Sequence, residues 1–307
     1  MAFPSWCRSK LSTAGLVALA FGTIGNTGCR TTPPKPQAAG LGDEIIVAGQ
    51  PFHTGTRIVT WMDPGGYDAY RGAGRFIPRQ GLQGSDGNLA ALQNVVDQLV
   101  LHYDGCGLSR ICFGKLHERG LSVHFLLDLD GTIYQTLDLQ ERALHATTSN
   151  DRSIGIEIAN LGAYPPGDTR EFDEWYPRDA AGQVFVKVPK VAGDPHFFTP
   201  NFTARPARSS PIHGALQGRE LVQYDFTPEQ YAALAKLTAA LCSVFPKIKC
   251  DFPRDSAGRL ITQKLSDAAL AKYQGILGHF HIQENKTDPG PAFQWDKFID
   301  GARKLLR

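Results

Sequence analysis

The chain has 307 residues, of which 42% are hydrophobic and 20% are charged, and its formal net charge is +2. This length and composition suit one large or two small globular domains with ample material for a core. No long run of lysine and arginine occurs, which argues against nucleic acid as the main partner. Composition therefore indicates a globular protein and leaves its function open.

The N-terminus has the pattern of an export signal. Arg8 and Lys10 precede an apolar stretch, residues 14–24, that is too short to span a bilayer. Small residues then lead to Cys29, and this arrangement resembles the processing site of bacterial lipoproteins, in which the cysteine is lipidated. Asn26 stands where that pattern prefers an aliphatic residue, so a plain secreted protein is the alternative.

Three further regions follow the predicted signal peptide, residues 1–29. Residues 30–42 are rich in proline and are typical of a flexible linker. We expect residues 43–307 to form the folded domain. Within it, residues 162–226 contain many prolines, glycines, aspartates and aromatic residues without clear periodicity. Such a long irregular stretch predicts an insertion on one rim of the fold.

Four cysteines remain if the signal peptide is removed and Cys29 is lipidated: Cys106, Cys112, Cys242 and Cys250. An even number of cysteines in an exported protein favours disulfide bonds, with three possible connectivities. The two local pairings, first with second and third with fourth, are the simplest. A cysteine-rich metal site is the alternative, but the gaps do not match the usual C-x-x-C spacing.

Short apolar runs predict the elements of the first half of the domain. Residues 45–47 and 58–61 are expected strands, and helical spacing at 88–100 leads into a buried strand at 99–103. His102 therefore lies near the carboxyl end of that strand, where open α/β sheets place their sites. A short helix and two strands are expected at 113–119, 123–127 and 132–137.

Residues 153–159 alternate strictly between isoleucines and small or acidic residues, which predicts a strand. Glu157 lies on the face opposite the three isoleucines, among small residues. A carboxylate in that setting is either a solvated outer position or the wall of a cleft.

Two helices are predicted in the C-terminal part. Residues 227–230, Thr-Pro-Glu-Gln, form a capping box with proline at the first helical position. The apolar stripe of the helix that follows consists of Tyr231, Leu234, Leu237, Leu241 and Phe245. A last helix from about Ala292 is expected to bury Trp295, Phe298, Ile299, Ala302 and Leu306. Because strands and helices are interspersed, the sequence predicts an α/β fold with a central mixed β-sheet flanked by helices.

Residues 278–290 place two histidines, a carboxylate and a lysine close together, behind the apolar pair Ile276 and Leu277. A strand that ends in a loop would bring imidazole and carboxylate to one ion, a ligand mixture that zinc accepts while it keeps a position for water. Lys286 would add a positive charge where an oxyanion forms. The alternative is a polar loop whose histidines are surface or core residues.

Six segments of the chain together match the pattern of a known family. They are residues 100–103, 122–135, 143–146, 153–157, 278–279 and 286–293. In this order they resemble the type-2 N-acetylmuramoyl-L-alanine amidases and the related peptidoglycan recognition proteins. The resemblance covers about residues 98–160 and 228–300. Each segment alone is weak, but six in the same order form a specific pattern.

The resemblance implies an amidase fold and a zinc ion held by His102, His279 and Asp288. It implies that Glu157 is the catalytic carboxylate and that Lys286 is the stabilising cation. The implied reaction is hydrolysis of the amide bond between N-acetylmuramic acid and L-alanine in peptidoglycan or muropeptides. Zinc would activate the water, and Glu157 would act as general acid and base.

Some assignments have competitors. His281 rivals His279, because residues two apart on a strand face the same way. The family places its ligand directly after the glycine, which favours His279. We expect His145 to line the cleft and bind substrate, while Asp288 could instead cap its Pro-Gly turn. Two features depart from the family: the segment between His279 and Lys286 is one residue shorter, and the insertion is unusually long.

A catalytically silent peptidoglycan-binding module is the alternative from another class. Silent members typically lose a metal ligand, whereas this chain keeps all three ligand positions together with Glu157 and Lys286. A zinc peptidase of unrelated type would need an H-E-x-x-H motif, which does not occur.

The resemblance also bears on the cysteines and on localisation. Cys106 and Cys112 resemble the short disulfide that recognition proteins carry after the first ligand histidine. A lipid anchor at Cys29 fits an enzyme that acts on the cell wall. We therefore expect a monomeric, periplasmic lipoprotein, anchored in the outer membrane, with secretion as the alternative.

Overall fold

A computed structural model of the protein describes residues 42–71, 76–79, 82 and 87–306. The predicted signal peptide, the lipidation site Cys29 and nearly all of the predicted linker lie outside the described residues. Among the helices of the described part, none combines the length and the apolar character that crossing a bilayer requires.

A six-stranded mixed sheet forms the centre of the fold, as the sequence predicts. The strand order is β12-β5-β9-β6-β7-β3; β6 and β7 pair antiparallel, and every other neighbouring pair is parallel. The strands are β3 (Ile58–Thr60), β5 (Gln98–Tyr103), β6 (Phe125–Leu127), β7 (Ile133–Gln135), β9 (Ser153–Ile158) and β12 (Gly275–Gly278). The strands β5 and β12 carry the short apolar runs Leu99–Leu101 and Ile276–Leu277, because both faces of this parallel region are covered, whereas β9 alternates isoleucines with small or acidic residues.

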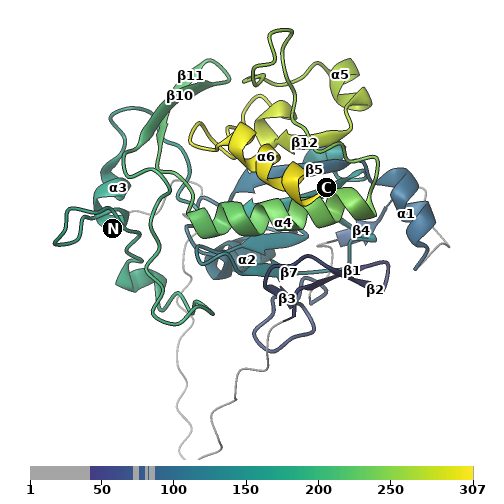
Figure 1. Ribbon diagram of the computed structural model, residues 1–307, viewed down its shortest axis with the longest axis horizontal. Coiled ribbons are helices and arrows are strands. Elements are labelled where there is room, and N and C mark those ends of the chain that lie inside the picture. The colour runs from purple at the N-terminus through teal and green to yellow at the C-terminus, as the bar shows by residue number, and fades with distance from the viewer. Residues whose placement is uncertain (1–41, 72–75, 80–81, 83–86, 307) are drawn as a thin grey trace, which may run out of the picture.

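Helices cover both faces of the sheet. The long helix α4 crosses one face with α6 beside it (Figure 1). Phe125 and Leu127 pack in the core cluster that includes α4, whereas Leu126 between them packs with Cys112 and Leu116 of α2. Since side chains alternate along a strand, α2 lies on the opposite face. The helices are α1 (Leu89–Val95), α2 (Ser109–Glu118), α3 (Arg170–Trp175), α4 (Pro228–Val244), α5 (Asp267–Lys272) and α6 (Trp295–Leu305).

The predicted capping box of α4 is confirmed. The hydroxyl of Thr227 accepts the N–H of Gln230 at 3.0 Å, and the side-chain oxygen of Gln230 accepts the N–H of Thr227 at 2.9 Å. The expected stripe from Tyr231 to Phe245 is buried. The last helix begins at Trp295, three residues later than expected, and Leu306 lies beyond its end with 39% exposure, so the prediction that Leu306 is buried was wrong.

The insertion at residues 162–226 contains regular elements that the sequence did not reveal. Helix α3 and the antiparallel hairpin of β10 (Ile212–Leu216) and β11 (Arg219–Gln223) lie at one side of the central sheet (Figure 1). Smaller elements elsewhere are β1 (Glu44–Val47), β2 (Gln50–His53), β4 (Phe76–Pro78), β8 (Glu141–Ala143) and the 3-10 turns η1 (Thr147–Ser149), η2 (Lys190–Ala192) and η3 (His279–His281).

Candidate active site

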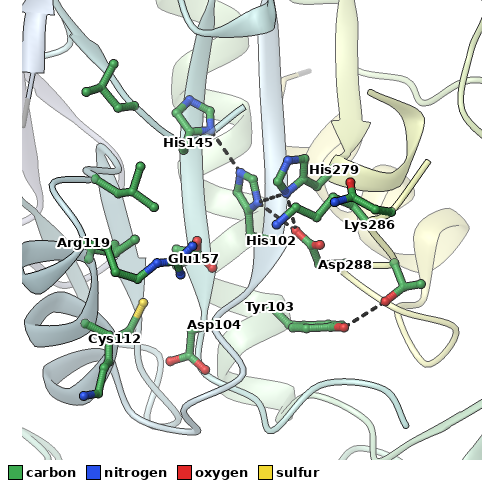
Figure 2. Close-up of a pocket in the computed structure, with 16 residues that line it drawn as sticks. His102, Tyr103, Asp104, Cys112, Arg119, His145, Glu157, His279, Lys286 and Asp288 are labelled. Carbon is green, nitrogen blue, oxygen red and sulfur yellow. Dashed lines mark hydrogen bonds and ion pairs between the residues drawn. The ribbon is translucent and has the colours of Figure 1, made fainter. Parts of the chain in front are cut away.

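A cleft of about 290 Å³ lies where the carboxyl ends of β5, β9 and β12 meet. The parallel register sets His102 of β5 beside Glu157 of β9, so both side chains point into the cleft from the same face of the sheet. His279 follows β12 directly, and Lys286 and Asp288 come from the loop after it. The structure therefore brings the five residues singled out by the sequence into one cleft (Figure 2).

Three side chains converge on one point in this cleft. Nδ1 of His102 lies 2.8 Å from Oδ2 of Asp288, Nδ1 of His279 lies 3.0 Å from the same oxygen, and the two nitrogens are 3.0 Å apart. All three residues are buried. Two imidazole nitrogens and a carboxylate oxygen this close together could hold one metal ion.

The ring of His279 is oriented by a neighbouring amide. Its Nε2 lies 2.6 Å from Oε1 of Gln283, an oxygen that only accepts hydrogen bonds. Nε2 therefore carries a hydrogen, which leaves Nδ1, the nitrogen that faces Asp288 and His102, as the one that could bind an ion. Such a partner on the second nitrogen is typical of metal-binding histidines.

The rival histidine, His281, has a structural role. Residues 279–281 form a 3-10 turn, so the prediction that His279 and His281 share one face of a strand was wrong. Nδ1 of His281 accepts the N–H of Gly278 at 2.9 Å, and its Nε2 donates to the carbonyl of Ile261 at 2.8 Å. With both nitrogens used and the ring fully buried, His281 has no lone pair for an ion.

Burial and neighbouring charge set the protonation of the ligand group. Burial lowers the pKa of His102 to about 4, with His279 adding to the effect and Asp288 opposing it. Burial alone would raise the pKa of Asp288, but His279 and the hydrogen bonds with both histidines hold that pKa below its usual range. Near neutral pH the group thus offers a neutral imidazole and a carboxylate, the forms that bind metal.

The cleft also holds two ionisable side chains without partners. The side chains of Glu157 and Lys286 make no hydrogen bond or ion pair within the part of the chain that the structure describes. Burial raises the pKa of Glu157 well above its usual range, Asp288 and Asp104 add to this, and Lys286 and Arg119 oppose it. Figure 2 shows Lys286 extending toward His102 and Asp288, with Arg119 beside Glu157.

His145 lies behind the metal-ligand group and lines the cleft, as the sequence predicts. Its Nδ1 is 3.0 Å from Nε2 of His102, and its Nε2 is 3.2 Å from the hydroxyl of Ser153. Its assignment to substrate binding stays a prediction.

Two buried residues that support the site were not identified from the sequence. Gln223, at the end of β11, donates to the carbonyl of Pro289 at 3.0 Å and accepts the N–H of Ala292 at 3.0 Å. A Cβ at Gly290 would lie 2.0 Å from the side-chain oxygen of Gln223, so only glycine fits there. Gln223 therefore supports the turn that directly follows Asp288, and no motif marks it.

The second is Arg79, which is fully buried. Its guanidinium donates to the carbonyls of Asn150, Asp151 and Ser153 at 2.9–3.2 Å and so fixes the segment that leads into β9. A single arginine without a surrounding pattern gives no sign of this role in the sequence.

The predicted cysteine pairs are close in the structure. Cys106 and Cys112 are buried in the same core cluster. The proximity of the two thiols raises the pKa of Cys242 and lowers that of Cys250. The two disulfides stay predictions.

The fold and the cleft define an α/β protein with a place for a metal ion, and the comparison with protein families identifies its class. The family model for N-acetylmuramoyl-L-alanine amidase matches residues 92–291, and the chain belongs to this family. Its substrate class is accordingly peptidoglycan or muropeptides. A comparison with curated proteins gave no match.

Solved structures similar to this chain include other amidases. A selenomethionine derivative of AmpD has 20% identity, with 78% of this chain and 99% of that chain covered and a TM-score of 0.33. The amidase AmiD from E. coli, in complex with anhydro-N-acetylmuramic acid-L-Ala-D-gamma-Glu-L-Lys, has 20% identity, with 67% and 57% covered and a TM-score of 0.38. The Ph2119 endolysin from Thermus scotoductus MAT2119 bacteriophage Ph2119 has 15% identity, with 80% and 99% covered and a TM-score of 0.39.

Proposed function

We propose that this protein is a zinc-dependent N-acetylmuramoyl-L-alanine amidase in which His102, His279 and Asp288 hold the ion. The observation that carries the proposal is the convergence of their three ligand atoms, 2.8–3.0 Å apart, next to the unpartnered carboxylate of Glu157. Two nitrogens and one oxygen are one of the donor sets found in catalytic zinc sites, which keep one position open.

The charged residues of the cleft divide the chemistry between them. When bound, zinc supplies a Lewis acid that polarises the amide carbonyl and makes water a better nucleophile near neutral pH. Glu157, with no hydrogen bond to the protein, takes the proton of the attacking water and returns it to the amine of L-alanine that leaves. The ammonium of Lys286 faces the position where negative charge develops on the carbonyl oxygen.

Metal removal tests this proposal. We expect EDTA to abolish the release of peptides from purified peptidoglycan and added Zn²⁺ to restore it, with mass spectrometry of the products identifying the cleaved bond. Activity that is indifferent to chelation would contradict the metal mechanism. Binding of peptidoglycan without any cleavage by the zinc-loaded protein would instead support the silent binding module.

We also propose that the protein is exported and anchored by a lipid at Cys29, and that Cys106–Cys112 and Cys242–Cys250 are disulfides. The support is the signal-like N-terminus and the interaction of the thiols of Cys242 and Cys250. Replacing Cys29 with serine should move the protein from the membrane fraction to the soluble fraction. Unchanged fractionation of that variant would contradict the lipid anchor.

A further inference from the structure

His145 stands between a metal-ligand candidate and the first residue of β9. Its ring is nearly perpendicular to that of His102, with an interplanar angle of 85° and ring centroids 5.2 Å apart. Nδ1 faces Nε2 of His102 at 3.0 Å, and Nε2 faces the hydroxyl of Ser153 at 3.2 Å. Both ring nitrogens are therefore engaged by the protein.

The surrounding backbone fixes the ring in this position. The side-chain oxygen of Asn150 accepts the N–H of His145 at 3.1 Å and so holds its main chain. A Cβ at Gly155 would lie 2.6 Å from Nδ1 and Cε1 of His145, so the ring rests directly against the backbone of β9. The absence of a side chain at Gly155 is what makes room for the imidazole.

The hydrogen-bond chain has a direct consequence for His102. A neutral imidazole carries one hydrogen, and His102 can offer Nδ1 to an ion only if that hydrogen sits on Nε2. A buried N–H needs an acceptor, and Nδ1 of His145 is at the right distance. His145 then carries its own hydrogen on Nε2, where the hydroxyl of Ser153 accepts it.

We propose that His145 is a positioning residue that fixes the metal-binding tautomer and the orientation of His102. It does for His102 what Gln283 does for His279, so each histidine ligand has one partner on its second nitrogen. The proposal rests on the proposed metal site but not on the reaction. It differs from the expectation that His145 contacts substrate, because its ring has no unused nitrogen.

Zinc affinity, measured on the purified metal-free protein by competition with a chelating dye, tests the proposal without reference to catalysis. We expect His145→Ala to weaken zinc binding about 10-fold to 100-fold, the usual effect of losing such a partner. His145→Asn places an amide oxygen near the position of Nδ1 and should restore affinity to within a few-fold. Ser153→Ala should weaken it only a few-fold, and His213→Ala, at an exposed histidine on β10, should leave it unchanged.

Further measurements separate positioning from other roles. Circular dichroism and thermal unfolding of the metal-free variants identify loss of folding, and Ser153→Ala keeps the test valid if His145→Ala does not fold. The visible spectrum of the cobalt-substituted protein should change in His145→Ala and recover in His145→Asn. Unchanged zinc affinity in His145→Ala, with a raised KM for muropeptide, would overturn the proposal in favour of substrate contact. Loss of affinity in a protein that proves inactive as an amidase would still support it.

Discussion

One group of residues in the cleft consists of His102, His279 and Asp288, whose ligand atoms lie within 3.0 Å of one another and are supported by further side chains. A second group consists of Glu157 and Lys286, whose side chains have no hydrogen-bond partner within the described ranges. The first group is fixed before anything binds. The second keeps its charges available for groups that arrive with the substrate.

This difference matches the chemical function of each group. A metal site needs ligand geometry that is set in advance, since small displacements of the ligands lower affinity. A group that transfers a proton or stabilises developing charge gains most when its interactions form in the transition state and not in the resting protein. The contrast between the two groups therefore predicts which substitutions affect metal binding and which affect the rate of hydrolysis.

The largest effect on activity is expected for the group without hydrogen-bond partners, Glu157 and Lys286. Glu157→Gln keeps the size of the side chain but removes the base, so kcat should fall about 10²-fold to 10⁴-fold. Zinc affinity should stay within a few-fold of the unsubstituted protein, because Glu157 is not part of the ligand group. Stopped assays on a soluble muropeptide and dye competition measure the two quantities.

The matched control for this variant is Glu229→Gln, at an exposed position in the first turn of α4, which should change neither quantity. A near-normal rate in Glu157→Gln would show that Glu157 is not catalytic and would contradict the proposed difference in function between the two groups.

An intermediate effect is expected at Gln223, through which the insertion supports the turn that follows Asp288. Gln223→Ala leaves the carbonyl of Pro289 and the N–H of Ala292 buried without their partner, which should lower the free energy of unfolding by about 1–3 kcal/mol. Because Pro289 directly follows Asp288, zinc affinity should also fall. Chemical denaturation and dye competition measure these effects, with exposed Gln263→Ala as the control. If Gln223→Ala loses stability without any change in zinc affinity, the insertion supports the fold but not the group of His102, His279 and Asp288.

The last effect depends on pH and concerns a buried carboxylate outside the cleft. Burial raises the pKa of Asp128 to about 8, above its ordinary value of 3.8. The folded protein therefore holds a proton that the unfolded chain releases between about pH 4 and pH 8, and the free energy of unfolding falls as pH rises through this window. Asp128→Asn should make the free energy of unfolding depend less on pH. The difference in this free energy between the variant and the unsubstituted protein should therefore shift in favour of the variant, by about 1 kcal/mol or more, between pH 5 and pH 8.

Urea denaturation at the two pH values checks this prediction, with exposed Asp300→Asn as a control that should leave the slope unchanged. An equal slope in Asp128→Asn would show that burial does not set the proton affinity of Asp128. The same explanation for the raised pKa of Glu157 would then be weakened.

The sequence predicted the elements whose signals are local. The apolar run of β5, the alternation of β9 and the capping box of α4 need only neighbouring residues to be recognised, and each was placed within about two residues. The hairpin β10–β11 and the six-residue helix α3 were missed, because their short segments mix glycine and charged residues and gain their stability by packing on the rest of the fold.

The same distinction applies to the site. The residues that carry chemistry stand in motifs and were identified through the resemblance. Gln223 acts on residues 66 and 69 positions away, and Arg79 on carbonyls 71–74 positions away, so neither leaves a local pattern. The turn η3 also escaped prediction, because a strand and a 3-10 turn both accommodate the residues His-Phe-His.

The long separation between the ligands determines when the site can form. His102 is 177 positions from His279 and 186 positions from Asp288, and β12 pairs with β5 across a similar distance. A chain that is still being synthesised or threaded through a membrane, and that lacks its last thirty or so residues, offers an ion one ligand of three. Under the proposed function, the complete ligand set therefore exists only after β12 has paired with β5, so binding of the metal by all three residues has to follow this long-range step of folding.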